Sequence, residues 1–440
     1  MMERTSDVIV LGAGASGLAA AERLLRAGLR VTVLEARDRL GGRVATIHDE
    51  VSGVPLELGA EFVHGKPKGL LKLARRARVK VRPCLDAHLL FWRGRSQDGD
   101  TAFDFTEALA AARPPDRPVA ELLRELARDG RWPPSKVAFA RGYVENFYGA
   151  QPETASALAI GRMEQAALDM GGITPFRVME GYMRALRPLT DALRRRPDTL
   201  FLNAVARDIR WSPGHVEVRA LTREGTPLGR FRASRLVVTL PVGVLRVKPP
   251  ELGAVRFLPR LPETERAWSR LEMGPIVKVL LRFRSPFWRE REHTAGYDFF
   301  QAPGQALGVF WALTPHNTNH LVGWCGGPMA RELSGLDERE VLRRTLDTLA
   351  RLFRMTRPSL HEQLESWRIQ DWQREPFTRG GYAVIPSGAM EAMDALAAPV
   401  RGTLFFAGEA TNTEGEEGTV HGALETGWRA AREVLAHARR

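Results

Sequence analysis

The first forty residues constrain the fold of this chain more than any other segment. An apolar run over Asp7–Leu11 leads directly into Gly-Ala-Gly-Ala-Ser-Gly (12–17), then a helical stretch that stops at Gly28 and a second apolar run that ends in Glu35. This order is the fingerprint of a dinucleotide-binding β-α-β unit: a strand, a G-x-G-x-x-G turn, a helix, a second strand and an acid. The sequence therefore predicts a parallel sheet of Rossmann type.

Each part of this unit has a physical task. Gly12 makes the tight turn, Gly14 lets a pyrophosphate approach the backbone, and Gly17 lets the helix pack closely on the strand. The helix N-terminus offers unpaired N–H groups and a partial positive charge to the phosphates. Glu35 is placed to accept hydrogen bonds from the ribose hydroxyls. The unit by itself does not choose between NAD and FAD.

The residues that follow resemble one family of flavoproteins. Residues 35–43, Glu-Ala-Arg-Asp-Arg-Leu-Gly-Gly-Arg, are similar to the stretch after the second strand in FAD-dependent amine oxidases, including monoamine and polyamine oxidases and histone-demethylase-like proteins. In that family the Gly pair passes close to the cofactor and the Arg helps to neutralise its phosphates. Residues 56–65 resemble the family's next segment, which runs under the isoalloxazine ring. Standing alone, residues 39–43 would also fit a solvated turn.

The end of the chain resembles the same family. Residues 402–409 form an apolar run that ends in Ala-Gly-Glu, and residues 418–427 open the last helix, as in the family's C-terminal FAD motif. The resemblance implies that Glu409 contacts the ribityl or pyrophosphate region and that the helix N-terminus points at the flavin. A purely structural strand and helix is the alternative. Because both ends resemble one family independently, FAD is favoured over NAD.

The resemblance implies a set of cofactor-binding residues spread over the whole chain: Gly12, Gly14, Ala15, Ser16, Gly17, Glu35, Ala36, Arg37, Gly42, Arg43, Gly59, Ala60, Glu61, Val205, Gly408, Glu409, Thr419 and Val420. Gly381 occupies the position at which monoamine oxidases attach their flavin covalently, so we expect non-covalent FAD.

The order of segments predicts an α/β fold, α+β overall. We expect a Rossmann-type FAD-binding domain over 1–80, 196–255 and 396–440, interleaved with a substrate-binding domain over 81–195 and 256–395 that is built on a mixed sheet flanked by helices. Within these ranges the patterns predict mostly helices over 66–151, strands over 268–300 and 308–324, and an amphipathic helix over 336–353.

Four residues are candidates for the chemistry. Lys278 lies in an otherwise apolar strand, where a buried ammonium group must lower its pKa or find partners; in amine oxidases the corresponding Lys holds a water against flavin N5, and an edge-strand Lys that reaches solvent is the alternative. Tyr382 matches an aromatic wall of the amine cage, and Thr419 stands at the second wall, as in the histone-demethylase branch. His64 either contacts substrate or is a satisfied core histidine.

Composition narrows the remaining classes of partner. The net charge is +12, but the cations are spread along the chain, usually with an acid nearby, and 57 of the 64 are Arg; we therefore expect no nucleic-acid partner. Two cysteines, Cys84 and Cys325, and no cluster with metal-ligand spacing predict no metal. No signal peptide and no apolar run of membrane-spanning length is found, so we expect a cytoplasmic monomer or homodimer without a membrane contact.

The expected function is FAD-dependent oxidation of a small-molecule amine. Hydride passes from the amine α-carbon to flavin N5, the imine is hydrolysed, and O2 reoxidises the flavin to give hydrogen peroxide. An L-amino-acid oxidase or a flavin desaturase is the first alternative, although desaturases generally lack the strand Lys. A non-catalytic FAD-binding protein or a demethylase subunit is the second. Glu414, Glu416 and Glu417 either attract a cationic amine or form a solvated loop.

Overall fold

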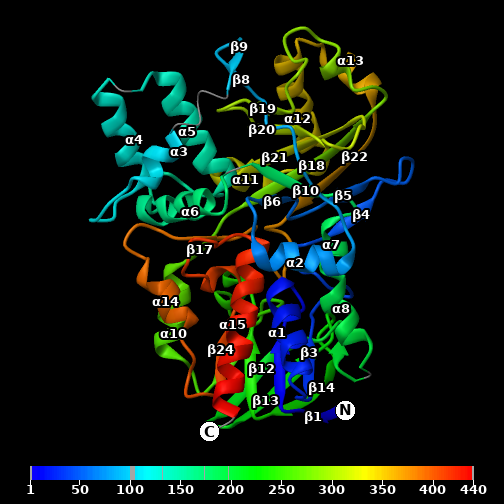
Figure 1. The fold of residues 1–440 in the computed structure, drawn as a ribbon, viewed down its shortest axis with the longest axis vertical. Coiled ribbons are helices and arrows are strands. Elements are labelled where there is room, and N and C mark those ends of the chain that lie inside the picture. Colours follow the sequence, from blue (N-terminus) through cyan, green and yellow to red (C-terminus); the bar gives the residue numbers. More distant parts are fainter. Residues whose placement is uncertain (1, 100–104, 131, 173, 197, 439–440) are drawn as a thin grey trace.

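The computed structural model describes residues 2–99, 105–130, 132–172, 174–196 and 198–438. The molecule has two halves stacked along its long axis, and both chain ends lie in the lower half (Figure 1). The chain passes between the halves several times, because the strands of the lower sheets come from the beginning, the middle and the end of the sequence. This is the α/β fold, α+β overall, that the sequence predicts.

A five-stranded parallel sheet lies at the centre of the lower half. In spatial order its strands are β11 (Leu200–Phe201), β3 (Val31–Leu34), β2 (Val8–Leu11), β15 (Arg235–Val238) and β24 (Leu404–Phe406). Every neighbouring pair is parallel. Only β15 therefore separates β2, the strand of the fingerprint, from β24, the last strand of the chain. Strands β2, β3 and β24 are buried along their whole length, as expected for a parallel sheet that is covered on both faces.

Helices cover one face of this sheet. They are α1 (Ala15–Arg26), α15 (Val420–Ala438), α2 (Lys68–Ala77) and α8 (Arg187–Arg194). The first and last helices touch closely, because a Cβ at Gly427 of α15 would lie 2.1 Å from the carbonyl oxygen of Ser16. The predicted return of the chain end to its beginning is therefore a direct backbone contact.

A second five-stranded sheet covers the other face. Its order is β1 (Met2–Thr5), β14 (Pro227–Ala233), β13 (His215–Leu221), β12 (Val205–Ser212) and β16 (Arg256–Leu258). Three helices pack beside it: α9 (Val242–Leu245), α10 (Pro262–Arg270) and α14 (Glu391–Ala397). Side chains of alternating residues, such as Val216, Val218 and Ala220 of β13, point into the shared core.

A mixed seven-stranded sheet forms the upper half. Its order is β22 (Leu364–Asp371), β18 (Ile276–Phe283), β21 (His320–Gly326), β20 (Val309–Ala312), β19 (Phe299–Gln301), β8 (His88–Trp92) and β9 (Arg95–Asp98). Helices α11 (Gly327–Ser334), α12 (Glu338–Phe353) and α13 (Arg357–Gln363) pack with it. The amphipathic helix predicted over 336–353 is confirmed as α12. Asp337 caps its N-terminus, because its side chain accepts a hydrogen bond from the Glu340 amide.

Two predictions for this half need correction. The strand pattern predicted over 268–300 begins too early, because Trp268 lies near the end of α10 and β18 starts only at Ile276. The segment 66–151 is not only helical: β7 (Val81–Pro83), β8 and β9 lie within it. Strand β8 is a short apolar run that is buried because it pairs with β19, a partner far away in the sequence.

The remaining helices and small sheets lie outside the three large sheets, and α3, α4 and α5 flank the upper half (Figure 1). The helices are α3 (Phe105–Ala110), α4 (Val119–Arg128), α5 (Pro134–Phe147), α6 (Ala157–Asp169) and α7 (Tyr182–Ala185), with single 3-10 turns η2 (Phe287–Arg289) and η3 (Glu409–Thr411). The small sheets are β6 (Phe62–His64), β10 (Pro175–Val178) and β7; β4 (Thr46–His48) and β5 (Pro55–Glu57); and β17 (Glu272–Met273) and β23 (Ala383–Val384). Helix α8, which the predicted division assigned to the substrate domain, packs on α1, and the domain boundaries remain a prediction.

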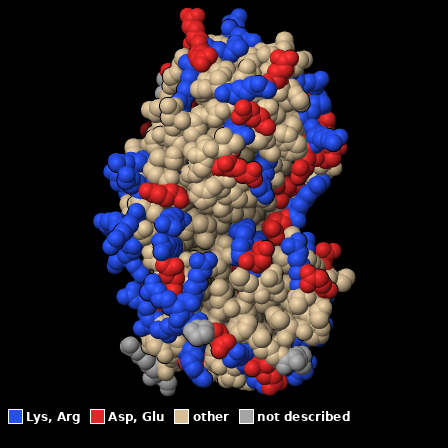
Figure 2. All heavy atoms as spheres, turned by 90° about the vertical axis from the view of Figure 1, so that its right-hand side faces the viewer, with Lys and Arg blue, Asp and Glu red and all other residues tan. Residues whose placement is uncertain are grey.

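The surface is rich in charge. Lys and Arg side chains gather along the left edge of the view in Figure 2, and acidic side chains are interspersed over the rest of that face. None of the described helices combines the length and apolar character needed to cross a bilayer. Cys84 and Cys325 are both buried and neither forms a disulfide.

Gly17 offers a test of the close packing in the dinucleotide unit. A Cβ at this position would lie 2.0 Å from the carbonyl oxygen of Gly12, whereas a Cβ at Gly142, also inside a helix, would meet nothing closer than 3.5 Å. We expect Gly17→Ala to lower stability by roughly 1–3 kcal/mol, as overpacking does, and Gly142→Ala to be neutral or slightly stabilising. Thermal unfolding of both variants measures this, and equal melting temperatures would contradict it.

Candidate active site

One cavity of about 400 Å³ runs between the two halves. All but one of the predicted cofactor-binding and catalytic residues line it, from both halves and from both ends of the chain. The exception is Gly17, which faces the Gly12 carbonyl instead. The structure thus brings residues from position 12 to position 420 around one space, although their individual roles stay predictions.

The lower end of the cavity has the form of a dinucleotide site. Gly12 has a φ of +95°, which suits glycine at the tight turn. At Gly14 a Cβ would meet no atom of the described chain closer than 3.9 Å, and at Gly408, with a φ of +128°, none within 4 Å. Both glycines line the cavity, so side chains there would fill the cradle rather than clash with protein. No side chain caps the N-terminus of α1 at Gly14, which leaves its N–H groups to an anion.

Glu35 is buried and holds the turn closed. Its carboxylate accepts hydrogen bonds from the Ala13 amide at 2.7 Å and from the Arg37 amide at 2.9 Å. Arg37 in turn bonds to Thr378 and lies 3.4 Å from Glu375, across the cavity wall. Ala36 and Val205 line the same end. This arrangement orients the acid of the fingerprint, and its predicted bond to a ribose remains a prediction.

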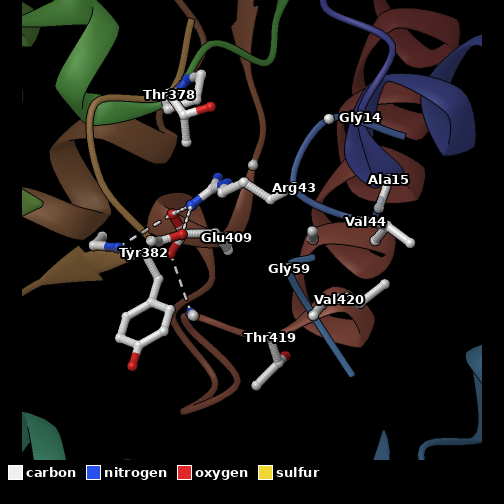
Figure 3. Close-up of a pocket in the computed structure, with 18 of the residues that line it drawn as sticks. Gly14, Ala15, Arg43, Val44, Gly59, Thr378, Tyr382, Glu409, Thr419 and Val420 are labelled. Atoms are coloured by element: carbon white, nitrogen blue, oxygen red, sulfur yellow. Dashed lines mark hydrogen bonds and ion pairs between the residues drawn. The ribbon is translucent and has the colours of Figure 1, made fainter. Parts of the chain in front are cut away.

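Arg43 and Glu409 join the first and last motifs. Figure 3 shows the two side chains pointing toward each other, with 2.8 Å between a guanidinium nitrogen and a carboxylate oxygen. The same carboxylate accepts hydrogen bonds from the Ala383 and Gly418 amides at 3.1–3.2 Å, and Arg43 also donates to the Gly381 carbonyl. The predicted phosphate and ribityl contacts of these two residues therefore have to coexist with an ion pair between them.

Lys278 is the centre of a buried charge cluster. It is 0 % exposed, in the middle of β18, so the edge-strand alternative is wrong. Its ammonium group forms an ion pair with Glu61 and donates to the Gly59 carbonyl at 3.2 Å. Trp311 and Trp324 place their rings 5.5 and 5.8 Å from the ammonium nitrogen. The partners that a buried ammonium requires are therefore present as a carboxylate and aromatic faces.

Glu61 is shared by three donors. Besides Lys278, it accepts hydrogen bonds from Arg177 of β10 and from the indole N–H of Trp311, the latter at 2.8 Å. The two cations hold the pKa of the Glu61 carboxyl at about 2, against the desolvation that burial imposes. Burial lowers the pKa of Lys278 from its usual range, with Glu61 acting in the opposite direction. The predicted cofactor residue Glu61 thus lines the cavity while its charge is directed at Lys278 and Arg177.

Tyr382 lies across the site from Gly14 and Ala15, whereas Thr419 lies beside Val420 at the start of α15, as Figure 3 shows. The Tyr382 hydroxyl donates to the Phe147 carbonyl, which fixes the ring beside Gly418. The Thr419 hydroxyl donates to the Glu416 carbonyl at 2.6 Å and accepts from the Gly422 amide at 3.0 Å. Thr419 therefore caps the start of α15, and one aromatic wall, Tyr382, stands where the resemblance implies the amine cage.

The end of the cavity away from the dinucleotide turn is lined by acids and tyrosines that sequence reasoning did not single out. Glu164 of α6 is 2 % exposed and accepts a hydrogen bond from the Tyr148 hydroxyl at 2.7 Å. Burial raises the pKa of Glu164 to about 7. No sequence motif marks this residue, because only the packing of α6 beside α5 brings it to the cavity.

The acidic run before α15 is divided by the fold. Glu414 is exposed, Glu416 is half-buried, and Glu417 is fully buried in the cavity wall, so a wholly solvated loop is wrong. Glu417 pairs with Arg162 at 3.0 Å through one carboxylate oxygen, while the other oxygen has no partner among the described residues. Burial raises the pKa of Glu417 above its usual range.

His64 and His421 face this same end. The His64 side chain lines the cavity and is accessible from it, so it is not a satisfied core histidine. His421 is buried, its Nε2 lacks a described partner, and burial lowers its pKa to about 3. Within the described residues no group of three His, Cys, Asp or Glu side chains could hold a metal ion.

Comparison with known proteins decides the family. The sequence profile of the flavin-containing amine oxidoreductases matches residues 15–435. This chain belongs to that family. The chain is 28% identical to lysine-specific histone demethylase 2 of Homo sapiens over 98% of its own length and 53% of the relative's, and 26% identical to the flavin-containing amine oxidase of Oncorhynchus mykiss over 98% and 86%. It thus spans about half the length of the demethylases it matches.

Solved structures agree with this assignment. Putrescine oxidase, solved with putrescine bound, superposes with a TM-score of 0.80 at 25% identity, covering 99% of this chain and 100% of that one. Cyclohexylamine oxidase from Brevibacterium oxydans has the same fold, with a TM-score of 0.82 at 22% identity over 99% and 100%. The protein is an FAD-dependent enzyme of the amine oxidoreductase class, and the open cradle at Gly14 and Gly408 fits its cofactor.

The charge cluster makes an asymmetric prediction for stability. Glu61→Gln removes the ion-pair partner of the buried Lys278 and Arg177 and should destabilise by about 3–5 kcal/mol. Lys278→Met leaves Glu61 with Arg177 and should cost less. Because the folded pKa of Glu61 is depressed to about 2 from a usual 4.5, its stabilisation is present above pH 4.5 and is lost as the pH falls toward 2. Urea unfolding of both variants at pH 7 and pH 3.5 measures this. A lower free energy of unfolding for Lys278→Met than for Glu61→Gln at pH 7 would contradict the prediction.

Proposed function

We propose that this protein oxidises a primary or secondary amine at its α-carbon, with molecular oxygen as the electron acceptor and hydrogen peroxide as the second product. The observation that carries the proposal is the buried Lys278, which lines the same cavity as the dinucleotide turn and Tyr382. Bound FAD would supply the redox chemistry, by taking up a hydride from the amine and giving two electrons to oxygen, which also takes up two protons. The residues that hold it are those of the glycine-rich turn, the 42–61 segment and the start of α15.

The protein's own residues orient the amine and control protons. Tyr382 offers an aromatic face to an amine, held in place by its hydroxyl bond to Phe147. The side chain of Lys278 is fully buried, so its ammonium group can exchange protons within the cavity at a place that bulk water does not reach. We propose that it holds the water that hydrolyses the imine. Burial between two halves favours a neutral amine as the reacting form, because an ammonium group would have to be desolvated.

The cavity favours amines over amino acids. An amino-acid substrate needs a cation for its carboxylate, yet the arginines that line the described cavity are Arg37 and Arg43, and each already faces an acid. The opposite wall carries Glu164 and Glu417, which suit a positive group. An L-amino-acid oxidase is therefore the weaker candidate, and a desaturase gives no role to Lys278.

The same wall indicates the substrate class. We propose that a second cationic group of a diamine reaches Glu164, which lines the same cavity as Glu417, an acid with one unpartnered oxygen. Putrescine, which is bound in one of the similar solved structures, is such a diamine. With a pKa of about 7, Glu164 is mostly neutral below pH 7 and ionised above it, so the attraction for a cation grows as the pH rises through 7.

Amine oxidation is tested with purified protein. A peroxide-coupled screen of monoamines, diamines, polyamines and amino acids should give turnover with at least one amine, and that amine should bleach the flavin under anaerobic conditions. Denaturation should release FAD from the polypeptide. A yellow protein that no amine bleaches would make it a non-catalytic flavoprotein and overturn the proposal.

Lys278→Met should retain FAD and slow flavin reduction or reoxidation at least about tenfold, because a proton-bearing group beside the reacting atoms contributes roughly 10²–10⁴-fold. Stopped-flow absorbance under anaerobic and then aerobic conditions separates the two half-reactions. Lys248→Met, at an exposed position outside the cavity, is the matched control. Rates for Lys278→Met equal to those of the control would remove Lys278 from the site.

Glu164→Gln should raise the KM for a diamine about tenfold while leaving kcat and the KM for a monoamine of equal length within twofold, since a charge-assisted hydrogen bond contributes roughly 1.5–3 kcal/mol. In the unmodified enzyme the diamine KM should fall more steeply between pH 6 and 8 than the monoamine KM, and Glu164→Gln should remove that difference. Glu414→Gln, an exposed acid of the neighbouring loop, is the control. Equal effects on both amines would exclude a role for Glu164 in recognising the second cation.

A further inference from the structure

One segment departs from the even distribution of charge in this chain. Between Glu61 and Asp86 there are eight Lys or Arg residues and no Asp or Glu. The segment holds four of the chain's seven lysines: Lys66, Lys68, Lys72 and Lys80. The other four cations are arginines between Arg75 and Arg82. The expectation that cations usually have an acid nearby is therefore wrong for this segment.

The fold turns all eight cations outward. Helix α2 buries Leu70, Leu73 and Ala74, and its remaining face carries the charged side chains. Every Lys and Arg from Lys66 to Arg82 is exposed, in α2 itself, just before it, or in the turn and strand β7 that follow. We call these eight side chains the basic face.

Few cations of the basic face form ion pairs, although Glu180 accepts a hydrogen bond from the Lys80 amide and Glu425 lies beside Gly69 of α2. Within the described part of the chain, Arg76 is the only one of the eight with an ion-pair partner, and that partner, Glu22, is shared with Arg26. Some surface arginines elsewhere are neutralised, as Arg343 and Arg344 are by Glu340, and the unpaired ones are scattered rather than consecutive along one helix and the turn after it. Cations that a fold leaves exposed and unpaired in one patch create a local positive potential.

We infer that the basic face binds the phosphate backbone of a nucleic acid. Helix α2 has ten residues and spans about 15 Å, and a duplex presents roughly one negative charge per 1.7 Å along its axis, so several cations can be neutralised at once. A lipid surface fits less well, because a membrane-bound amphipathic helix turns its apolar side to the bilayer, and the apolar side of α2 is packed in the core. The expected recognition is of charge rather than of sequence.

The basic face begins at the wall of the cavity. The Lys66 amide donates to the Met170 carbonyl at 2.9 Å, and both Met170 and His64 line the cavity. A nucleic acid on this face would cancel positive charge beside the site to which a cationic amine must come. Binding itself does not depend on the proposed amine oxidation, so the two can fail separately.

The experiment uses the full-length protein with its flavin and a fluorescein-labelled 20-base-pair duplex of arbitrary sequence, followed by anisotropy between 50 and 300 mM salt. Binding should weaken steeply with salt, with a slope of log K against log salt of about −4 to −6. The variant K68Q/K72Q/R75Q/K80Q should bind at least about tenfold more weakly at 100 mM salt, with a slope shallower by about 3.

A control with the same net charge distinguishes a local surface from a general one. R210Q/R266Q/R339Q/R368Q removes four exposed arginines that have no ion pair among the described residues, at sites outside the basic face. It should change the affinity less than about threefold. Equal losses in the two variants, no binding of the duplex, or preferential binding to phosphatidylserine-containing vesicles would each overturn the inference.

Discussion

The buried contact among Lys278, Glu61 and Arg177 is the interaction that holds the two halves in register. Lys278 belongs to the upper seven-stranded sheet, Glu61 follows the segment that lines the cofactor cavity, and Arg177 comes from the small sheet between them. Each charge is almost completely removed from water, and Glu61 is the group on which both cations depend, because it forms the ion pair with each of them. The cluster therefore ties a strand of the upper sheet and a strand of the small sheet to the segment that lines the cofactor cavity.

The chain's repeated crossing between the halves gives the cavity its composition. Because β2, β15 and β24 are neighbours, the first glycine turn and the last helix face each other, and Arg43 and Glu409 join them by an ion pair. The cofactor end is thus built from backbone amides and glycines at the ends of the sequence. The other end is built from side chains that lie between those ends in the sequence, such as Tyr382 and Glu164, together with Glu417. One continuous space therefore joins an end lined by glycines to an end lined by carboxyl groups and tyrosines.

The cavity and the nearby surface over α2 carry side chains of opposite charge. The cavity wall beyond Lys278 carries carboxyl groups whose pKa values are raised by burial, whereas the surface over α2 carries cations that have few partners. The inner acids act on a ligand only over a short range and in a low dielectric. The outer cations act over about 8–10 Å in physiological salt and favour an anionic polymer. The two surfaces thus carry opposite charges, and they adjoin where Lys66 follows the cavity wall.

Local rules along the chain are enough to predict the dinucleotide unit, the C-terminal strand and helix, and the need of Lys278 for partners in an apolar strand. These rules are glycines at fixed spacing, an apolar run before an acid, and an ammonium group in an apolar strand. Three-dimensional packing was needed to make Glu61 the counter-ion of Lys278, to bring Glu164 and Glu417 into the cavity, and to bury β8 as a strand. Each of these depends on a partner distant in the chain, as Glu61 does on Lys278 and β8 on β19. Periodicity and spacing report on neighbours along the chain, whereas burial and pairing of such residues are set by the packing of whole elements.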